Sequence, residues 1–290
     1  MGINIRTNIS SMNTQRYLNS STDALSASYS RLSSGLRIVK ASDDAAGLSI
    51  AEQLKADSKI ATVAIRNAND GVSAISIING AVDEMTSTLT RLAELAEQSA
   101  NGVYSLEQRS ALESEYKNLA DELQRIVNTT QFNGLDLLDH QGNLDFQVGY
   151  DGQIDSRITL SGIQVGLIKL GLAEVDGSGY KLKYSLTDSS STEVAQSNSR
   201  SALDAFKSAI NIMTGLRGQI GSAESRLNVA ISNLAVSKEN FTAAESRIRD
   251  VDVAAESAEL SRLSILQQAA AAMLTQANQQ PAMALQLLKQ

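Results

Sequence analysis

Proline is almost absent from this sequence, because Pro281 is the only one among 290 residues. Average usage would place roughly 14 prolines in a chain of this length. Proline breaks helices, since it has no backbone N–H to donate and its ring clashes with the preceding turn. A chain that avoids proline over residues 1–280 can therefore form unusually long, uninterrupted helices.

Apolar residues recur in alternating steps of three and four between residues 65 and 96, which is the spacing of coiled coils and long helix bundles. The two rows are Ile75, Val82, Leu89 and Ala96, and Ile78, Met85 and Leu92. This spacing predicts a helix over about residues 57–101. Asn101-Gly102 supplies the signal that ends it.

Two more helices are predicted to pack with the first as an antiparallel rod. Ser105-x-x-Gln108 is the pattern of a capping box, and the helix it begins has an apolar face of Leu112, Tyr116, Leu119, Leu123 and Ile126. The other starts near residues 199–201, and its stripe is Ile220, Ala223, Leu227, Ala230, Leu234, Ser237 and Phe241. We expect rod packing by Ile75, Val82, Leu89, Leu112, Leu119, Leu227, Leu234 and Phe241.

The pattern changes to short alternating runs between residues 131 and 197. Runs such as 145–148 and 157–160 alternate polar and apolar side chains between Asn-Gly and Asp-Gly turns, which predicts short β-hairpins. The glycines of residues 176–181 predict a further hairpin turn. The polar stretch 187–201 is predicted to be a loop.

The two ends of the sequence carry narrow amphipathic stripes. Leu18, Leu25 and Leu32 form one N-terminal row and Thr22, Tyr29 and Leu36 the other, while the C-terminal stripe is Leu263, Leu266, Ala270, Met273, Leu274 and Ala277. Such helices are marginal in isolation. We therefore expect them to pack on each other and on neighbouring copies through Leu18, Leu25, Leu32, Leu36, Leu263, Leu266, Met273 and Leu274. Pro281 should end or kink the last helix.

These patterns predict a mainly α fold: an elongated antiparallel bundle or coiled coil of long helices, with a small β-hairpin region between the N- and C-terminal halves. The absence of cysteine excludes disulfides, thiol catalysis and cysteine-based zinc sites. A net charge of −7 argues against nucleic-acid binding. No run approaches the ~20 apolar residues of a membrane span, and the first residues lack the apolar region of a secretory signal.

Signals for chemistry are weak. His140 is the only histidine and falls in a predicted surface turn, and residues 176–181 lack the Lys-Ser/Thr ending of a phosphate loop. Asp43-Asp44 precedes a helix, which predicts a capping role. We therefore predict no catalytic, cofactor-binding or metal-binding residue, no cofactor and no enzyme activity. An enzyme on a helical scaffold is the alternative from a different class.

Gly215, Gly218 and Gly221 lie three residues apart inside the third predicted helix. Each costs about 1 kcal/mol of helix stability relative to alanine. Close packing and local flexibility are the two explanations open at this point.

Several long segments match a single family in the right order. They are Lys40 to Ala51 (KASDDAAGLSIA), Leu89 to Gly102 (LTRLAELAEQSANG), Thr130 to Leu135 (TQFNGL), Arg226 to Asp252 (RLNVAISNLAVSKENFTAAESRIRDVD) and Ala258 to Gln279 (AELSRLSILQQAAAAMLTQANQ). These segments resemble bacterial flagellin, and the resemblance covers roughly residues 1–170 and 200–290.

The resemblance implies a domain organisation. Residues 1–43 and 255–290 would form a terminal coiled-coil domain at the filament core, and residues 44–175 and 196–254 a helical rod domain with a β-region near 131–173. Only residues 174–195 remain, as a short surface-exposed variable loop. Many flagellins carry large outer domains there, so the resemblance implies a short form.

The resemblance also implies a function. The chain would be a structural subunit that self-assembles into the flagellar filament for swimming motility, exported by the flagellar type III pathway. Implied partners are further copies of itself, an export chaperone at the C-terminal segment, and the flagellar cap and hook-associated junction proteins. The filament would be secreted, outside the cell or in a periplasm. The alternative is a hook–filament junction protein, which shares end helices of this type.

Two surface features are implied as well. In flagellins seen by Toll-like receptor 5, an Arg, a Leu and a Glu form the contact surface, and the matching positions are Arg91, Leu95 and Glu115. The Gln that commonly precedes the Arg in these flagellins is replaced by Thr90 here. Flagellins are sometimes O-glycosylated in the outer loop, at positions that correspond here to Ser189, Ser190, Ser191 and Thr192.

Overall fold

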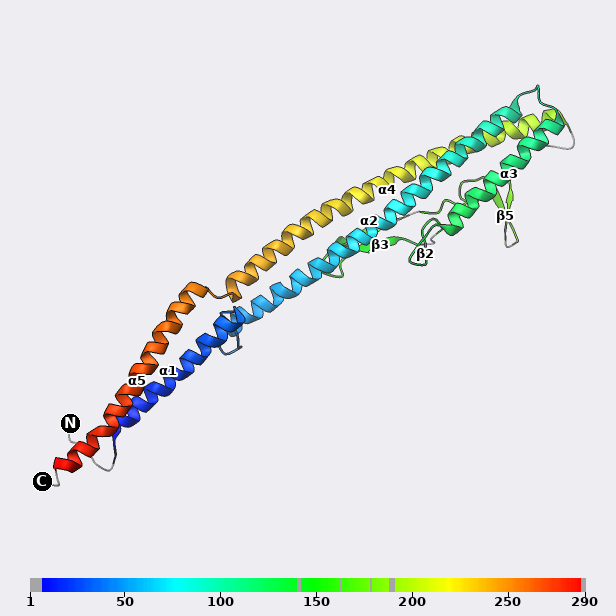
Figure 1. The fold of residues 1–290 in the computed structure, drawn as a ribbon. Coiled ribbons are helices and arrows are strands. Elements are labelled where there is room, and N and C mark those ends of the chain that lie inside the picture. Colours follow the sequence, from blue (N-terminus) through cyan, green and yellow to red (C-terminus); the bar gives the residue numbers. More distant parts are fainter. Residues whose placement is uncertain (1–6, 140–141, 162, 178, 188–190, 288–290) are drawn as a thin grey trace. The chain divides into compact units, whose positions relative to one another are not determined.

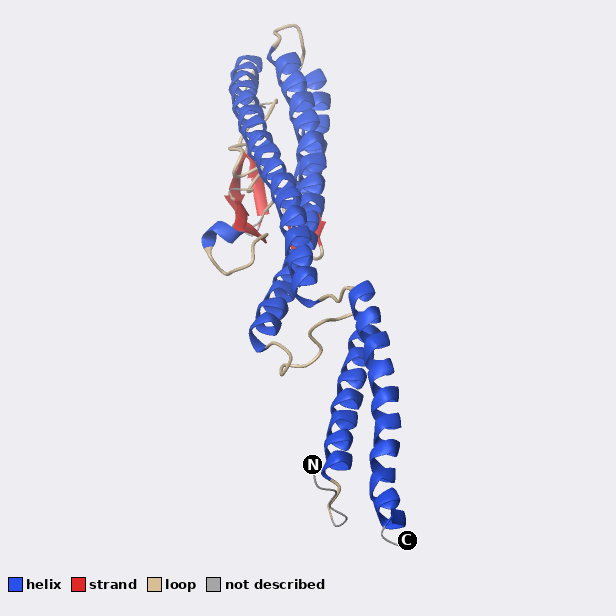
Figure 2. Cartoon of the chain, turned by 90° about the vertical axis from the view of Figure 1, so that its left-hand side faces the viewer, coloured by secondary structure: helices blue, strands red, loops and turns tan. Residues whose placement is uncertain are grey.

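The computed structural model describes residues 7–139, 142–161, 163–177, 179–187 and 191–287. Its residues divide into two compact units. The terminal unit comprises residues 1–58 and 239–290, and the central unit comprises residues 59–238. The fold is mainly α, as predicted, and the strands that the structure describes lie in the middle of the sequence (Figures 1 and 2).

Among the described residues the α-helices are α1 (Ile9–Ser34), α2 (Ala45–Ala100), α3 (Leu106–Thr129), α4 (Thr192–Arg249) and α5 (Val253–Leu287) (Figure 1). With 56 and 58 residues, α2 and α4 are very long helices, as the lack of proline allows. The helix α5 runs through position 281 to Leu287, so the expectation that Pro281 ends it is wrong. A proline removes only one backbone hydrogen bond, and a helix can continue past it at that cost.

Two helix starts lie earlier than predicted. α2 begins at Ala45 and not near residue 57. The predicted capping role of Asp43-Asp44 is confirmed for Asp44, whose Oδ1 atom accepts the backbone N–H of Gly47 at 2.8 Å. α4 begins at Thr192, so the prediction of a loop up to residue 201 is wrong. There the Ser191 hydroxyl accepts the backbone N–H of Val194 at 3.2 Å. The buried face of this first part of α4 consists of Ala195 and Ser199, which are too small to give a clear apolar signal.

The predicted capping box at the start of α3 is confirmed. The Ser105 hydroxyl accepts the Gln108 backbone N–H at 3.3 Å, and the Gln108 side chain accepts the Ser105 backbone N–H at 3.0 Å. The helices α2 and α3 are antiparallel. Arg91 of α2 donates to Glu115 of α3, whereas Ser99, which lies later in α2, accepts a hydrogen bond from Arg109, which lies earlier in α3.

Antiparallel strand pairs occupy the middle of the chain, as predicted, and the part that the structure describes contains three of them. They are β1 (Gln131–Phe132) with β2 (Leu135–Asp136), β3 (Leu144–Gln147) with β4 (Arg157–Leu160), and β5 (Ala173–Asp176) with β6 (Gly179–Leu182). The turn of the first pair uses Asn133 and Gly134 with φ of 52° and 78°. Tyr180 of β6 donates to Asp121 of α3, and burial together with this hydrogen bond raises the pKa of Tyr180 to about 12.

The core of the central unit is one continuous cluster between α2, α3, α4 and the hairpins. On α4 the buried positions follow alternating steps of four and three: Ala195, Ser199, Ala202, Phe206, Ala209, Met213, Leu216, Ile220, Ala223 and Leu227. Most small side chains fall in one row and the large ones in the other. Contacts between Ser99 and Ser199 (3.0 Å) and between Asp83 and Arg217 (2.6 Å) show that α2 and α4 are antiparallel.

The residues expected to pack the rod are placed as follows. Ile75, Val82, Leu89, Leu227 and Leu234 are buried in the cluster, and Leu112 and Leu119 are half-buried against it. Phe241 is half-buried and belongs to the terminal unit.

Gly215, Gly218 and Gly221 are not explained by close packing within the chain, because a Cβ atom added at any of them would meet no heavy atom within 4 Å. Gly71 of α2 differs, since its added Cβ would lie 2.9 Å from the Phe146 ring and 3.2 Å from Leu227. The two kinds of helical glycine therefore offer a matched comparison.

We expect Gly218→Ala to raise the free energy of unfolding by about 0.5–1 kcal/mol, because alanine loses less backbone entropy on folding. Gly71→Ala should lower it by about 1–3 kcal/mol, because the new methyl group displaces Phe146. Urea unfolding of the two variants and the parent chain measures both changes. A Gly218→Ala variant less stable than the parent would contradict the open environment of this position.

Candidate functional site

In the part of the chain that the structure describes, no group of three or more His, Cys, Asp or Glu side chains is placed to hold a metal ion. His140 lies outside the described residues. Asp43 accepts the backbone N–H groups of Lys40 and Val39, which hold its pKa below the ordinary value, so it orders a turn while Asp44 caps α2.

Among the helices that the structure describes, none is both long enough and apolar enough to cross a membrane.

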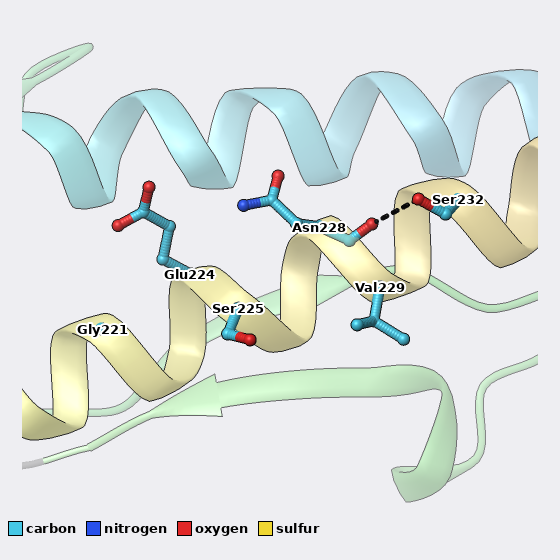
Figure 3. A pocket seen from close by; sticks show the side chains of 6 residues that line it. All are labelled: Gly221, Glu224, Ser225, Asn228, Val229 and Ser232. Carbon is cyan, nitrogen blue, oxygen red and sulfur yellow. Dashed lines mark hydrogen bonds between the residues drawn. The ribbon is translucent and has the colours of Figure 1, made fainter.

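Pockets in the central unit are open surface hollows. One is lined by Gly221, Glu224, Ser225, Asn228, Val229 and Ser232, all from α4 (Figure 3). The Ser232 hydroxyl donates to the Asn228 carbonyl of its own helix at 3.0 Å (Figure 3). A single exposed helix face of this kind does not enclose a substrate.

The terminal unit pairs α1 with α5, which lie side by side (Figures 1 and 2). The Asn8 side chain donates to the Ala277 carbonyl at 2.8 Å, and the Gln267 side chain donates to the Thr22 hydroxyl at 3.1 Å. Further along, Arg31 and Glu256 form an ion pair at 3.0 Å. As the residue numbers rise along α1, those of the contacting residues on α5 fall, so the two helices are antiparallel.

The seam between α1 and α5 follows a seven-residue repeat on both helices. The buried and half-buried residues of α1 include Ser11, Thr14, Leu18, Ser21, Leu25, Ser28 and Leu32, and those of α5 include Glu256, Leu260, Leu263, Gln267, Ala270, Leu274 and Ala277. The expected second N-terminal row is wrong, because Thr22 and Tyr29 are exposed and serines take their place. Leu36 is half-buried beyond the end of α1.

A second apolar face remains exposed in the terminal unit. Leu266 and Met273 were expected in the same stripe as Leu263, but they are 43% and 62% exposed. We call the exposed large apolar residues of α1 and α5 the outer apolar set: Ile9, Met12, Tyr17, Tyr29, Val253, Ile265, Leu266 and Met273. A helix that is apolar on two sides needs a partner on each side, and α1 covers only one side of α5.

The segments next to these helices are joined to each other by a short backbone bridge, which we call the clasp (residues 35–37 and 248–251). Leu36 pairs with Asp250 in antiparallel fashion, with hydrogen bonds from Arg37 N to Arg249 O (2.6 Å) and from Val251 N to Gly35 O (3.1 Å). The Arg37 guanidinium also donates to the Ile248 carbonyl at 2.6 Å, near the C-terminus of α4. Gly35 adopts the left-handed conformation that this turn needs, with φ of 71°.

The structure also reveals a buried polar cluster in the central unit that the sequence interpretation missed. Arg109 is fully buried and donates to Ser99 Oγ (3.1 Å), Asn101 O (2.8 Å) and Tyr104 O (3.3 Å). Glu113, also buried, accepts the Leu186 backbone N–H at 2.6 Å. A signal existed, since both residues continue the four-and-three spacing of the buried α3 residues Tyr116, Ala120 and Leu123.

The residues matched to receptor recognition are only partly at the surface. Arg91 is exposed and forms ion pairs with Glu115 (2.6 Å) and Glu94 (3.0 Å), which raise its pKa. Leu95 is fully buried in the core cluster, so its side chain does not lie on the surface of the chain beside Arg91. Its position in the α2 heptad turns it toward the bundle.

Of the four residues matched to glycosylation, Ser189 and Ser190 lie outside the described residues. Ser191 caps α4, and Thr192 is the first residue of this helix and so does not lie in a loop. O-glycosylation of this segment stays a prediction, which an intact-mass measurement checks.

Both helical regions of this chain match family models of known proteins. Residues 5–143 match the family model of the bacterial flagellin N-terminal helical region, and residues 203–288 match that of the C-terminal helical region. The chain belongs to the bacterial flagellin family. Flagellins are structural proteins of the flagellar filament and not enzymes, so this flagellin is a structural filament subunit that serves motility.

Relatives of this flagellin share its whole length. It is 40% identical over 286 residues to the flagellin of Halalkalibacterium halodurans, covering 98% of this chain and 99% of that protein. It is 39% identical over 305 residues to the flagellin of Bacillus subtilis, with the same coverage. Both support flagellin over the junction-protein alternative, and its 290 residues fit a short form without a large outer domain.

Among solved structures, this flagellin is similar to the crystal structure of Bacillus cereus flagellin. The two share 23% sequence identity with a TM-score of 0.48, over 58% of this chain and 88% of that chain.

Proposed function

We propose that this flagellin polymerises through its terminal unit, with the outer apolar set of each copy buried against neighbouring copies. The observation that carries the proposal is the second apolar face of α5, where Ile265, Leu266 and Met273 are 66%, 43% and 62% exposed. In this arrangement one stripe of α5 packs on α1 of the same chain, and the other stripe is free for assembly. The terminal unit would then be the filament-core domain and the central unit the rod.

The energetics support this use of the surface. Burying roughly a few hundred Å² of apolar surface per neighbour, at about 25 cal/mol per Å², gives several kcal/mol before ordering costs. Each subunit in a helical polymer has several neighbours, so modest contacts add up. The small exposed residues Ala269 and Ala272 between the large ones allow close approach of another helix.

The contacts between α1 and α5 stabilise these helices only weakly before assembly. Their seam contains four hydroxyl side chains of α1, Ser11, Thr14, Ser21 and Ser28, in addition to its leucines. The Ser28 hydroxyl is buried without a hydrogen-bond partner. A seam of this kind offsets little of the entropy lost when two helices become ordered, so we expect the ends to order on assembly.

Limited proteolysis tests this coupling of folding to assembly. We expect protease to remove about 40 residues from each end of the dilute free chain, because the ends bury too little surface to stay ordered. A fragment close to the central unit should persist, and the same sites should be protected in filaments. Mass spectrometry identifies the cleavage sites. Terminal helices that resist protease equally in the dilute chain and in the filament would contradict the proposal.

The outer apolar set also supports proposals about the partners and the location of this flagellin. Exposed Ile265, Leu266 and Met273 would need cover before assembly, which supports an export chaperone on the C-terminal segment. We further propose that this flagellin is exported by the flagellar type III pathway. Its filament would grow beneath the cap protein and attach to the hook-associated junction proteins. The product would be a secreted filament, external to the cell or periplasmic.

Toll-like receptor 5 is a further proposed partner, through exposed Arg91 and Glu115 rather than buried Leu95. We expect Arg91→Ala to weaken reporter-cell activation by about tenfold or more, since charged side chains at an interface centre often dominate binding. Arg125→Ala is the control, because Arg125 forms a comparable exposed ion pair on α3 with Glu122. Parent chain that fails to activate the receptor at saturating dose would end this proposal.

A further inference from the structure

The methionines of this chain fall into two classes. Of the six in the sequence, the side chains of Met12, Met85, Met213 and Met273 are described. Met85 and Met213 are fully buried in the core of the central unit, with 0% exposure. Met12 and Met273 are 63% and 62% exposed, and both belong to the outer apolar set of the terminal unit.

The two exposed methionines lie at the same end of the α1–α5 pair. Met12 follows Ser11, whose hydroxyl donates to the Asn278 side chain at 2.6 Å. Met273 lies one helical turn before Ala277, whose carbonyl accepts the Asn8 side chain at 2.8 Å. Their exposed apolar neighbours along the helices are Ile9 and Leu266.

We propose that Met12 and Met273 are oxidation sites whose conversion to methionine sulfoxide blocks filament assembly. The inference rests on the proposed function, because it requires the outer apolar set to be buried between subunits. The oxidant is a peroxide. The thioether sulfur attacks one peroxide oxygen, the O–O bond breaks and an S–O bond forms. The sulfur is oxidised by two electrons, and the peroxide is reduced to water or an alcohol.

The chemistry of the product explains the block. A sulfoxide is polar and requires a hydrogen-bond donor when it is buried, whereas a thioether does not. Because every subunit carries both sites, the cost recurs at each step of growth. Methionine sulfoxide reductases reverse the reaction, so the block is reversible.

Exposure also predicts when the reaction occurs. In the free chain Met12 and Met273 are open to the oxidant, whether or not the terminal helices are ordered, while Met85 and Met213 are enclosed. Assembly would cover the exposed pair. Oxidation would therefore act on subunits before assembly and spare those already in a filament.

The first test treats free chain and seeded filaments with hydrogen peroxide and maps the oxidised peptides. We expect Met12 and Met273 in the free chain to react about tenfold or more faster than Met85 and Met213, and to slow by a similar factor in filaments, in line with their exposure. Equal rates for the two pairs in the free chain, or equal rates for Met12 and Met273 in chain and filament, would overturn the inference.

The second test measures the critical concentration for seeded growth after peroxide treatment and after methionine sulfoxide reductase. We expect oxidation to raise it about tenfold or more and the reductase to restore it. The variant Met12→Leu/Met273→Leu should keep growing after oxidation, since leucine replaces methionine with little change in volume. Met85→Leu/Met213→Leu is the matched control and should stay sensitive.

The outcomes separate this inference from the proposed function. If Met12→Leu/Met273→Leu remains as sensitive as the parent chain, the block arises elsewhere and the inference fails. If the oxidised parent chain grows normally, the inference fails while the proposed function stands. If untreated parent chain does not grow from seeds at all, the proposed function itself fails.

Discussion

Leu266→Asp is expected to abolish filament growth at ordinary protein concentrations while leaving the central unit folded. Leu266 is 43% exposed in the single chain and belongs to the outer apolar set that we assign to subunit contacts. A carboxylate buried at such a contact has no partner and loses its hydration, so we expect the critical concentration to rise about 100-fold or more. Seeded growth followed by light scattering and electron microscopy measures this change.

The control for this prediction is Gln268→Asp, which places the same charge two residues away. Gln268 is exposed on the polar side of α5, together with Ser257, Ser261 and Thr275. We expect it to change the critical concentration far less than Leu266→Asp does. Equal growth of Leu266→Asp and parent chain would show that the outer apolar set is not an assembly surface.

The second large effect concerns the core of the central unit. Phe206 is 1% exposed and meets the Tyr116 ring edge-on, with centroids 6.0 Å apart and planes at 67°. It lies in the row of large side chains on α4, and small residues such as Ala202 and Ala209 leave room around it. We expect Phe206→Ala to lower the free energy of unfolding by about 3–5 kcal/mol, because it removes apolar contacts and leaves a cavity.

Urea unfolding of the free chain measures the effect of Phe206→Ala. The matched control is Ile212→Ala on the same helix, where the isoleucine is 48% exposed. That substitution should cost less than about 1 kcal/mol. Similar losses for the two variants would contradict the placement of Phe206 between α3 and α4.

Much of the fold could be predicted because burial and helical spacing agree. The heptad rows of α2 contain Ile75, Val82 and Leu89, which are large, apolar and fully buried, so their pattern is easily seen. The same reasoning fails where buried residues are small or polar. The first turns of α4 bury Ala195 and Ser199, and the α1 seam buries Ser28 where a larger residue was expected.

The candidate site shows a second limit of prediction from sequence, which concerns the side of a helix on which an apolar residue lies. α5 is apolar on two sides, so Leu263, Leu266 and Met273 looked like members of one stripe. Of these three residues only Leu263 is buried, because the seam continues through Gln267 and Leu274. Leu266 and Met273 also fit steps of three and four from Leu263, so spacing alone could not separate the two sides of α5. Leu95 is the opposite case. Its match by sequence position predicted a surface residue, but its side chain is buried.

The clasp has a mechanical consequence. Its backbone hydrogen bonds join residues 35–37 to residues 248–251, so a pull on either segment is shared with the other. In a filament that transmits torque, each subunit would then carry load through two chain segments acting as one tie, and neither segment could be stretched without the other.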